Sequence, residues 1–118
     1  MNWKNVFKKG QELTLSTCSK NSEPNANIVI SLGFVGDKLL IADAQMDRTI
    51  KNLKENGKIC IVSKADGKYY RLKGEVKIFD SGKYFDICIE SDKEYPAKNA
   101  IVVSVKEVFD LDNINPII

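Results

Sequence analysis

An alternation of apolar and charged residues between positions 68 and 79 constrains the fold most strongly. Every second residue from Tyr70 to Ile78 is apolar or glycine, and the residues between them are charged. This period of two is typical of a β-strand that packs on one face and meets water or a partner on the other. The chain must therefore build a sheet with one covered face.

Further strands are expected where alternation or β-forming residues recur, at residues 12–19, 26–35, 38–42, 58–64 and 100–109. Apolar residues at helical spacing predict helices at residues 2–9, 48–56 and 83–91, the first two ended by Gly10 and Gly57. For 118 residues this predicts one domain over residues 1–118. We expect a mainly β (α+β) fold, a small antiparallel split β-barrel with flanking helices.

The composition excludes several kinds of chemistry. Because the chain has no histidine, imidazole-activated nucleophiles, histidine-ligated haem and the usual zinc sites are excluded, and we expect no metal centre. The net charge of +2 gives no reason to expect nucleic acid, and no apolar run is long enough to span a membrane. Three widely spaced cysteines, Cys18, Cys60 and Cys88, indicate reduced core thiols in a cytoplasmic protein.

The segment from Lys38 to Leu53 changes its period from strand to helix across a polar loop. We expect Asp47 to cap the helix, which places Arg48 and Thr49 in the first turn, where backbone N–H groups have no partner inside the helix. A guanidinium and a hydroxyl at that position suit a phosphate monoester. The alternative is an ordinary capped surface helix.

Several short motifs follow one another in a distinctive order. A loop ending in Glu-Pro-Asn precedes a strand ending in Ile-Ala-Asp-Ala, and Arg-Thr then opens the helix Ile-Lys-Asn-Leu-Lys-Glu-Asn-Gly. Tyr-Arg-Leu-Lys-Gly-Glu-Val and Pro-Ala-Lys-Asn-Ala-Ile-Val-Val-Ser-Val come later. In this order, from about Gln11 to Leu111, the chain resembles the pyridoxamine 5'-phosphate oxidase-like split-barrel flavoproteins.

The resemblance implies a homodimer that binds flavin mononucleotide (FMN) between its two subunits, with the deazaflavin F420 as the alternative cofactor. Arg48 and Thr49 are similar to the phosphate-binding pair of the family, in agreement with the anion site argued above. Tyr70 stands where the second subunit would reach the flavin.

The resemblance also assigns residues to the rest of the cofactor. The strand segment beside the isoalloxazine ring is similar to Asn27, Ile28 and Val29. The strand end that lines the ribityl chain and the ring edge is similar to Ala42, Asp43 and Ala44.

The sequence departs from the family pattern at three points, and the first of them narrows the function. The family's vitamin B6 oxidases carry a basic, histidine-containing segment near the C-terminus, and because this sequence has no histidine, a true pyridoxamine 5'-phosphate oxidase is not expected. In addition, Asn27 replaces a basic residue, and Met46-Asp47 stands where those enzymes have Ser or Gly.

The sequence therefore predicts an FMN-dependent oxidoreductase acting on an unidentified small molecule, with chemistry supplied by the cofactor. One alternative is a non-catalytic flavin-binding or electron-carrier protein. Another is a β-barrel interaction module without flavin, whose basic and aromatic residues on the long strand would contact single-stranded nucleic acid. Glu75 within that strand and the low net charge argue against nucleic acid.

Overall fold

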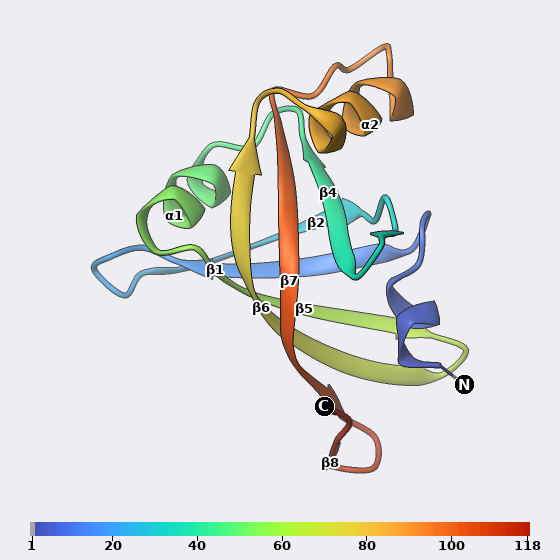
Figure 1. Ribbon diagram of the computed structural model, residues 1–118. Coiled ribbons are helices and arrows are strands. Elements are labelled where there is room, and N and C mark those ends of the chain that lie inside the picture. Colours follow the sequence, from blue (N-terminus) through green and yellow to red (C-terminus); the bar gives the residue numbers. More distant parts are fainter. Residues whose placement is uncertain (1) are drawn as a thin grey trace.

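The computed structural model describes residues 2–118, and its main feature is one curved, antiparallel sheet of eight strands (Figure 1). Seven strands follow the order β2-β1-β5-β6-β7-β4-β3, and β8 pairs with β7. The elements in chain order are η1 (Trp3–Phe7), β1 (Glu12–Cys18), β2 (Pro24–Ile30), β3 (Phe34–Val35), β4 (Lys38–Asp43), α1 (Arg48–Asn56), β5 (Lys58–Ala65), β6 (Lys68–Phe79), α2 (Lys83–Ser91), β7 (Asn99–Asp110) and β8 (Asn115–Pro116).

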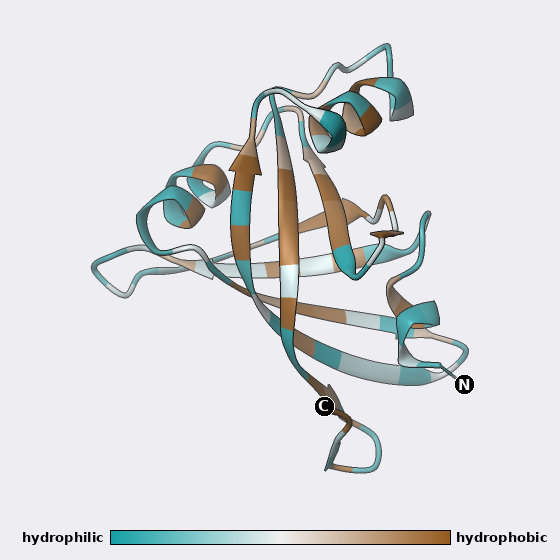
Figure 2. Cartoon of the chain, viewed as in Figure 1, coloured by the Kyte–Doolittle hydropathy of each residue, from teal (hydrophilic) through white to brown (hydrophobic). Residues whose placement is uncertain are grey.

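The sheet does not close on itself, because β2 and β3, at its two ends, each pair with a strand on one side only. The predicted fold class, a mainly β split barrel with flanking helices, is thereby confirmed. Alternating residues of β6 are buried as predicted, and Figure 2 shows hydrophobic and hydrophilic residues following one another along this strand. The inward-facing side chains fill the barrel with a core that includes Leu13, Leu15, Ile61 and Leu72.

Two predicted elements differ from the structure, and one further strand was not predicted. The helix predicted over residues 2–9 is a 3-10 helix, η1, of only five residues, Trp3–Phe7. Its Val6 and Phe7 are fully buried in the barrel core. The predicted strand 26–35 is divided into β2 and β3, because Gly33 adopts a φ of +85° and the Ser31 side chain turns inward to donate a hydrogen bond to the Phe7 carbonyl. The tail, for which no structure was predicted, adds β8.

The two helices cover different parts of the sheet (Figure 1). Helix α1 packs against β1 and β2 and ends at Gly57, whose φ of +60° is the left-handed conformation expected after a helix. Helix α2 packs against β7 and β4, where Cys88 joins Leu40 and Val102 in a second apolar cluster. Among residues 2–118, no helix combines the length and the apolar content needed to span a membrane.

Candidate functional site

A groove of about 410 Å³ lies between β2 and the loop that joins β4 to α1. Apart from Asp43 and Tyr70, every residue that the sequence assigned to a cofactor lines this groove. Its complete lining is Asn25, Ala26, Asn27, Ile28, Val29, Ala42, Ala44, Gln45, Met46, Asp47, Arg48 and Thr49. The structure therefore brings together segments that the sequence placed on separate elements.

The first turn of α1 has open backbone donors. The predicted cap is wrong, because Asp47 has a helical backbone conformation and its side chain makes no capping hydrogen bond. The first backbone hydrogen bond of α1 is donated by the Lys51 N–H to the Asp47 carbonyl at 3.1 Å. Within residues 2–118, the N–H groups of residues 48–50 have no acceptor. Together with the helix dipole, they favour an anion at this point.

Arg48 adds an exposed positive charge to the same end of the groove. Its side chain is 58% exposed, and its guanidinium lies 3.8 Å from the carboxylate of Glu23. An exposed pair of this kind contributes less than about 1 kcal/mol to stability. The guanidinium can therefore exchange Glu23 for another anion at little cost.

Thr49 is placed differently from Arg48. Its side chain is only 3% exposed, and its hydroxyl donates to Asn27 Oδ1 at 2.8 Å while accepting a hydrogen bond from Asn25 Nδ2 at 3.1 Å. The hydroxyl hydrogen of Thr49 is thus already committed to another residue that lines the groove.

Asp43 holds the loop between β4 and α1, which forms one wall of the groove. Its side chain is buried, with Oδ1 accepting a hydrogen bond from the Met46 N–H and Oδ2 accepting one from Asn99 Nδ2, both at 2.8 Å. Its carbonyl accepts a hydrogen bond from the Lys98 N–H at 2.7 Å. Asp43 therefore fixes the shape of the loop between β4 and α1 instead of lining the cavity.

The structure does not bring Tyr70 to this groove. Its side chain is 6% exposed and packs into the barrel core of its own chain, because Tyr70 belongs to the inward-facing set of β6. Tyr69, on the opposite face of the strand, is 40% exposed. The role of Tyr70 toward a second subunit stays a prediction, and Tyr69 is the more exposed of the two tyrosines.

Asn25 is the site residue that sequence reasoning missed. It stands two residues before Asn27 on β2, so the period of the strand places both amides on the same face. That spacing was visible in the sequence, but nothing in it showed that α1 would place Thr49 between the two amides.

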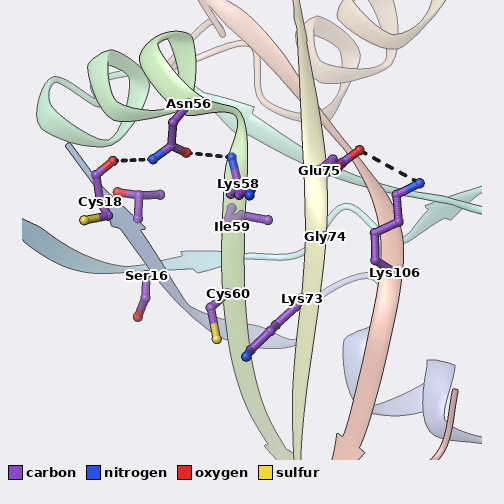
Figure 3. A pocket seen from close by; sticks show the side chains of 11 residues that line it. Ser16, Cys18, Asn56, Lys58, Ile59, Cys60, Lys73, Gly74, Glu75 and Lys106 are labelled. Atoms are coloured by element: carbon purple, nitrogen blue, oxygen red, sulfur yellow. Dashed lines mark hydrogen bonds and ion pairs between the residues drawn. The ribbon is translucent and has the colours of Figure 1, made fainter. Parts of the chain in front are cut away.

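A second cavity, of about 480 Å³, opens on the outer face of the sheet and contains none of the predicted site residues (Figure 3). Cys18 and Cys60, predicted as core thiols, are only half-buried and line this cavity, whereas Cys88 is buried as predicted. Burial raises the pKa of the Cys60 thiol in spite of the nearby positive charges of Lys73 and Arg71. The lining also contains the charged residues Lys58, Lys73, Glu75 and Lys106.

Comparisons with known proteins agree with the fold. An uncharacterized protein of Methanocaldococcus jannaschii is 29% identical over 105 residues, which cover 82% of this chain and 70% of that protein. The crystal structure of HupZ from Group A Streptococcus superimposes with a TM-score of 0.83 at 19% identity, covering 96% of this chain and 94% of the other.

Two further solved structures share the fold and carry cofactors in their names. An FMN-binding protein from Syntrophomonas wolfei has a TM-score of 0.74 at 26% identity, over 91% of this chain and 80% of that one. An F420 reductase has a TM-score of 0.71 at 16% identity, over 92% and 96%. The sequence profile of the pyridoxamine 5'-phosphate oxidase family matches residues 2–112. The chain therefore belongs to the pyridoxamine 5'-phosphate oxidase family.

Proposed function

We propose that this protein binds FMN in the groove between β2 and α1, with the phosphate at the start of the helix. The observation that carries the proposal is the set of open N–H groups at residues 48–50 beside the exposed guanidinium of Arg48. A phosphate dianion would receive both directional hydrogen bonds and positive charge there. The FMN-binding protein from Syntrophomonas wolfei, with the same fold at 26% identity, supports the choice of flavin.

The other wall of the groove suits the rest of a flavin. β2 is an edge strand, so the N–H and C=O groups on its free edge have no strand partner within residues 2–118. A flavin ring carries amide-like donors and acceptors that can pair with such an edge, while Ile28, Val29 and Ala42 offer apolar contacts. Phosphate site and strand edge belong to one groove, so a single ligand can use both.

The proposed chemistry is an oxidation or reduction of a small molecule, for which bound FMN would accept or donate a hydride or electrons. No histidine and no lysine line the groove, and its only acidic group is the exposed Asp47. The protein would therefore contribute binding, orientation and exclusion of water. The missing histidine argues against a true pyridoxamine 5'-phosphate oxidase. The fold shared with an F420 reductase supports a deazaflavin as the alternative cofactor.

We also propose that two copies of this chain associate through the outer face of the sheet, which would place a cofactor near a subunit boundary. The strand registers set Ile28, Thr14, Val62, Arg71 and Phe109 side by side across five strands of that face. Ile28 is 64% exposed in the single chain. An exposed apolar residue such as Ile28, followed across the sheet by the half-buried Val62 and Phe109, is typical of an interface.

Titration of the cofactor-free protein with FMN and with riboflavin tests the proposal. FMN is expected to bind at micromolar concentration or tighter, and more tightly than riboflavin, because only FMN carries the phosphate. Arg48→Ala is expected to remove most of this preference while leaving riboflavin binding unchanged. Lys51→Ala, one turn further along the same helix, is the matched control for loss of a positive charge. Absence of binding by either flavin would contradict the proposal.

A further inference from the structure

The three side chains that connect β2 to the first turn of α1 form a directed chain of hydrogen bonds. Asn25 Nδ2 donates to Thr49 Oγ1 at 3.1 Å, and Thr49 Oγ1 donates in turn to Asn27 Oδ1 at 2.8 Å. Asn25 uses an amide N–H and Asn27 uses its amide oxygen, while the Thr49 hydroxyl both accepts and donates. The oxygen of Asn25 and the Nδ2 group of Asn27 therefore remain available.

The Thr49 hydroxyl has one hydrogen, which it donates in the hydrogen bond to Asn27 Oδ1. Thr49 therefore has no hydrogen left for a phosphate unless this bond breaks. The bond also holds the carbonyl oxygen of Asn27 against the helix, which leaves its Nδ2 group on the other side of the amide. Within residues 2–118, that Nδ2 group has no acceptor and is not among the buried, unpaired atoms. It is open to the groove that Asn27 lines.

We infer that Thr49 is a positioning residue, held by Asn25, whose hydroxyl orients the Asn27 amide so that its N–H groups donate to an uncharged acceptor atom of the ligand. This inference rests on the proposed function and deepens it. Asn27 becomes the residue that recognises the ligand, and Thr49 acts through Asn27 instead of binding the phosphate.

The direction of the hydrogen bond between Thr49 and Asn27 explains why the acceptor is not the phosphate. Arg48, the charged group of the anion site, pairs with Glu23, which directly precedes β2. Because the Asn27 oxygen accepts from Thr49 in the first turn of α1, its Nδ2 group points away from the N–H groups of that turn. A ligand with its phosphate beside Arg48 would bring its ribityl hydroxyls or ring carbonyls past Asn27.

The contact between α1 and the sheet contains a second hydrogen bond of the same kind, which provides a control. Asn52 Nδ2 donates to Thr17 Oγ1 at 3.1 Å, and both side chains are buried outside the groove. Thr17→Val thus removes a buried threonine hydroxyl that helps to hold α1 on the sheet, as Thr49→Val does, but it leaves Asn27 untouched.

Binding of FMN and of riboflavin by these variants tests the inference. Thr49→Val and Asn27→Leu are each expected to weaken both flavins by the same factor, about five- to tenfold for one hydrogen bond. The double variant should be no weaker than Asn27→Leu alone, because both changes remove the same contact. Thr49→Ser, which keeps the hydroxyl, and Thr17→Val should bind both flavins as the wild type does.

A measurement without ligand separates this inference from the proposed function. NMR order parameters of the Asn27 side-chain amide are expected to be high in the wild type and in Thr49→Ser, and to fall in Thr49→Val. If the wild type binds neither flavin, the proposed function fails, while the amide order still decides whether Thr49 positions Asn27. An equally mobile amide in wild type and Thr49→Val would overturn it. So would a Thr49→Val variant that loses affinity for FMN alone, since Thr49 would then contact the phosphate directly.

Discussion

At the mouth of the groove, the ion pair between Arg48 and Glu23 competes with any incoming anion. Both side chains are largely exposed, and the 3.8 Å separation makes the pair weak. A phosphate bound to Arg48 must displace Glu23 and would then lie close to its carboxylate.

Glu23→Gln is therefore expected to strengthen FMN binding by about threefold to tenfold and to leave riboflavin binding unchanged. The gain should shrink at high salt, because these groups are exposed. Glu94→Gln, which removes an exposed charge outside the groove, is the control. Equal gains for both flavins would contradict the assignment of Arg48 to the phosphate.

Cys88 links stability to alkaline pH. Burial in the cluster beneath α2 raises the pKa of its thiol from 9.0 to about 11. As the pH rises, the thiol loses its proton in the unfolded chain before it does so in the folded one. The contribution of the buried thiol to the free energy of unfolding is therefore complete below pH 9 and is lost as the pH rises to about 11. Urea unfolding of wild type and Cys88→Ala should show the stability advantage of the wild type decreasing over this range, by at most about 3 kcal/mol. A constant difference between the two proteins would contradict the burial of a neutral thiol.

At the scale of elements, α1 was predicted over its observed residues because both of its ends have a local signal. Arg48 follows a polar loop, and Gly57 supplies the left-handed residue at the end. The cap failed because Asp47 itself has a helical backbone conformation, and its side chain accepts no N–H group of the first turn.

The pair of long strands β6 and β7 depends on Gly74. The strand register shifts between Lys73 and Gly74, and a Cβ atom at Gly74 would lie 2.6 Å from the Ser104 carbonyl oxygen. Because that neighbour is backbone, the strands would have to separate.

Gly74→Ala is expected to destabilise the fold by about 2–4 kcal/mol, as measured by urea unfolding. Lys77→Ala, at an exposed position of the same strand, should change stability by less than about 0.5 kcal/mol. A Gly74→Ala protein as stable as the control would show that the approach of β6 to β7 is not tight.

At the scale of the whole molecule, the outer face of the sheet carries exposed Ile28 and Ile30 on β2 and exposed Tyr69 on β6. If this face joins two copies, Ile28→Asp places a charge in the interface and is expected to shift the protein from dimer to monomer. Sedimentation equilibrium measures the shift, with Ile114→Asp, an exposed isoleucine of the tail, as the control. A monomeric wild type, or a dimer unaffected by Ile28→Asp, would contradict the proposed interface.

The order of strands and helices along the sequence was enough to predict which segments form the groove. The strand segment 27–29, the strand end at Ala42 and the pair Arg48-Thr49 lie on one groove as expected. The sequence did not indicate that the Thr49 hydroxyl would be taken by Asn27, because two segments more than twenty residues apart had to be packed together first. Tyr70 was assigned to the cofactor although its place in the alternation already put it on the buried face.

The central claim is that the start of α1 binds the phosphate of a flavin, and backbone NMR of the protein titrated with FMN and with riboflavin tests it most directly. FMN is expected to shift the amide signals of residues 48–50 strongly, whereas riboflavin should shift those of β2 and leave residues 48–50 nearly unchanged. If FMN binds without shifting residues 48–50, or does not bind at millimolar concentration, the groove between β2 and α1 is not a flavin phosphate site.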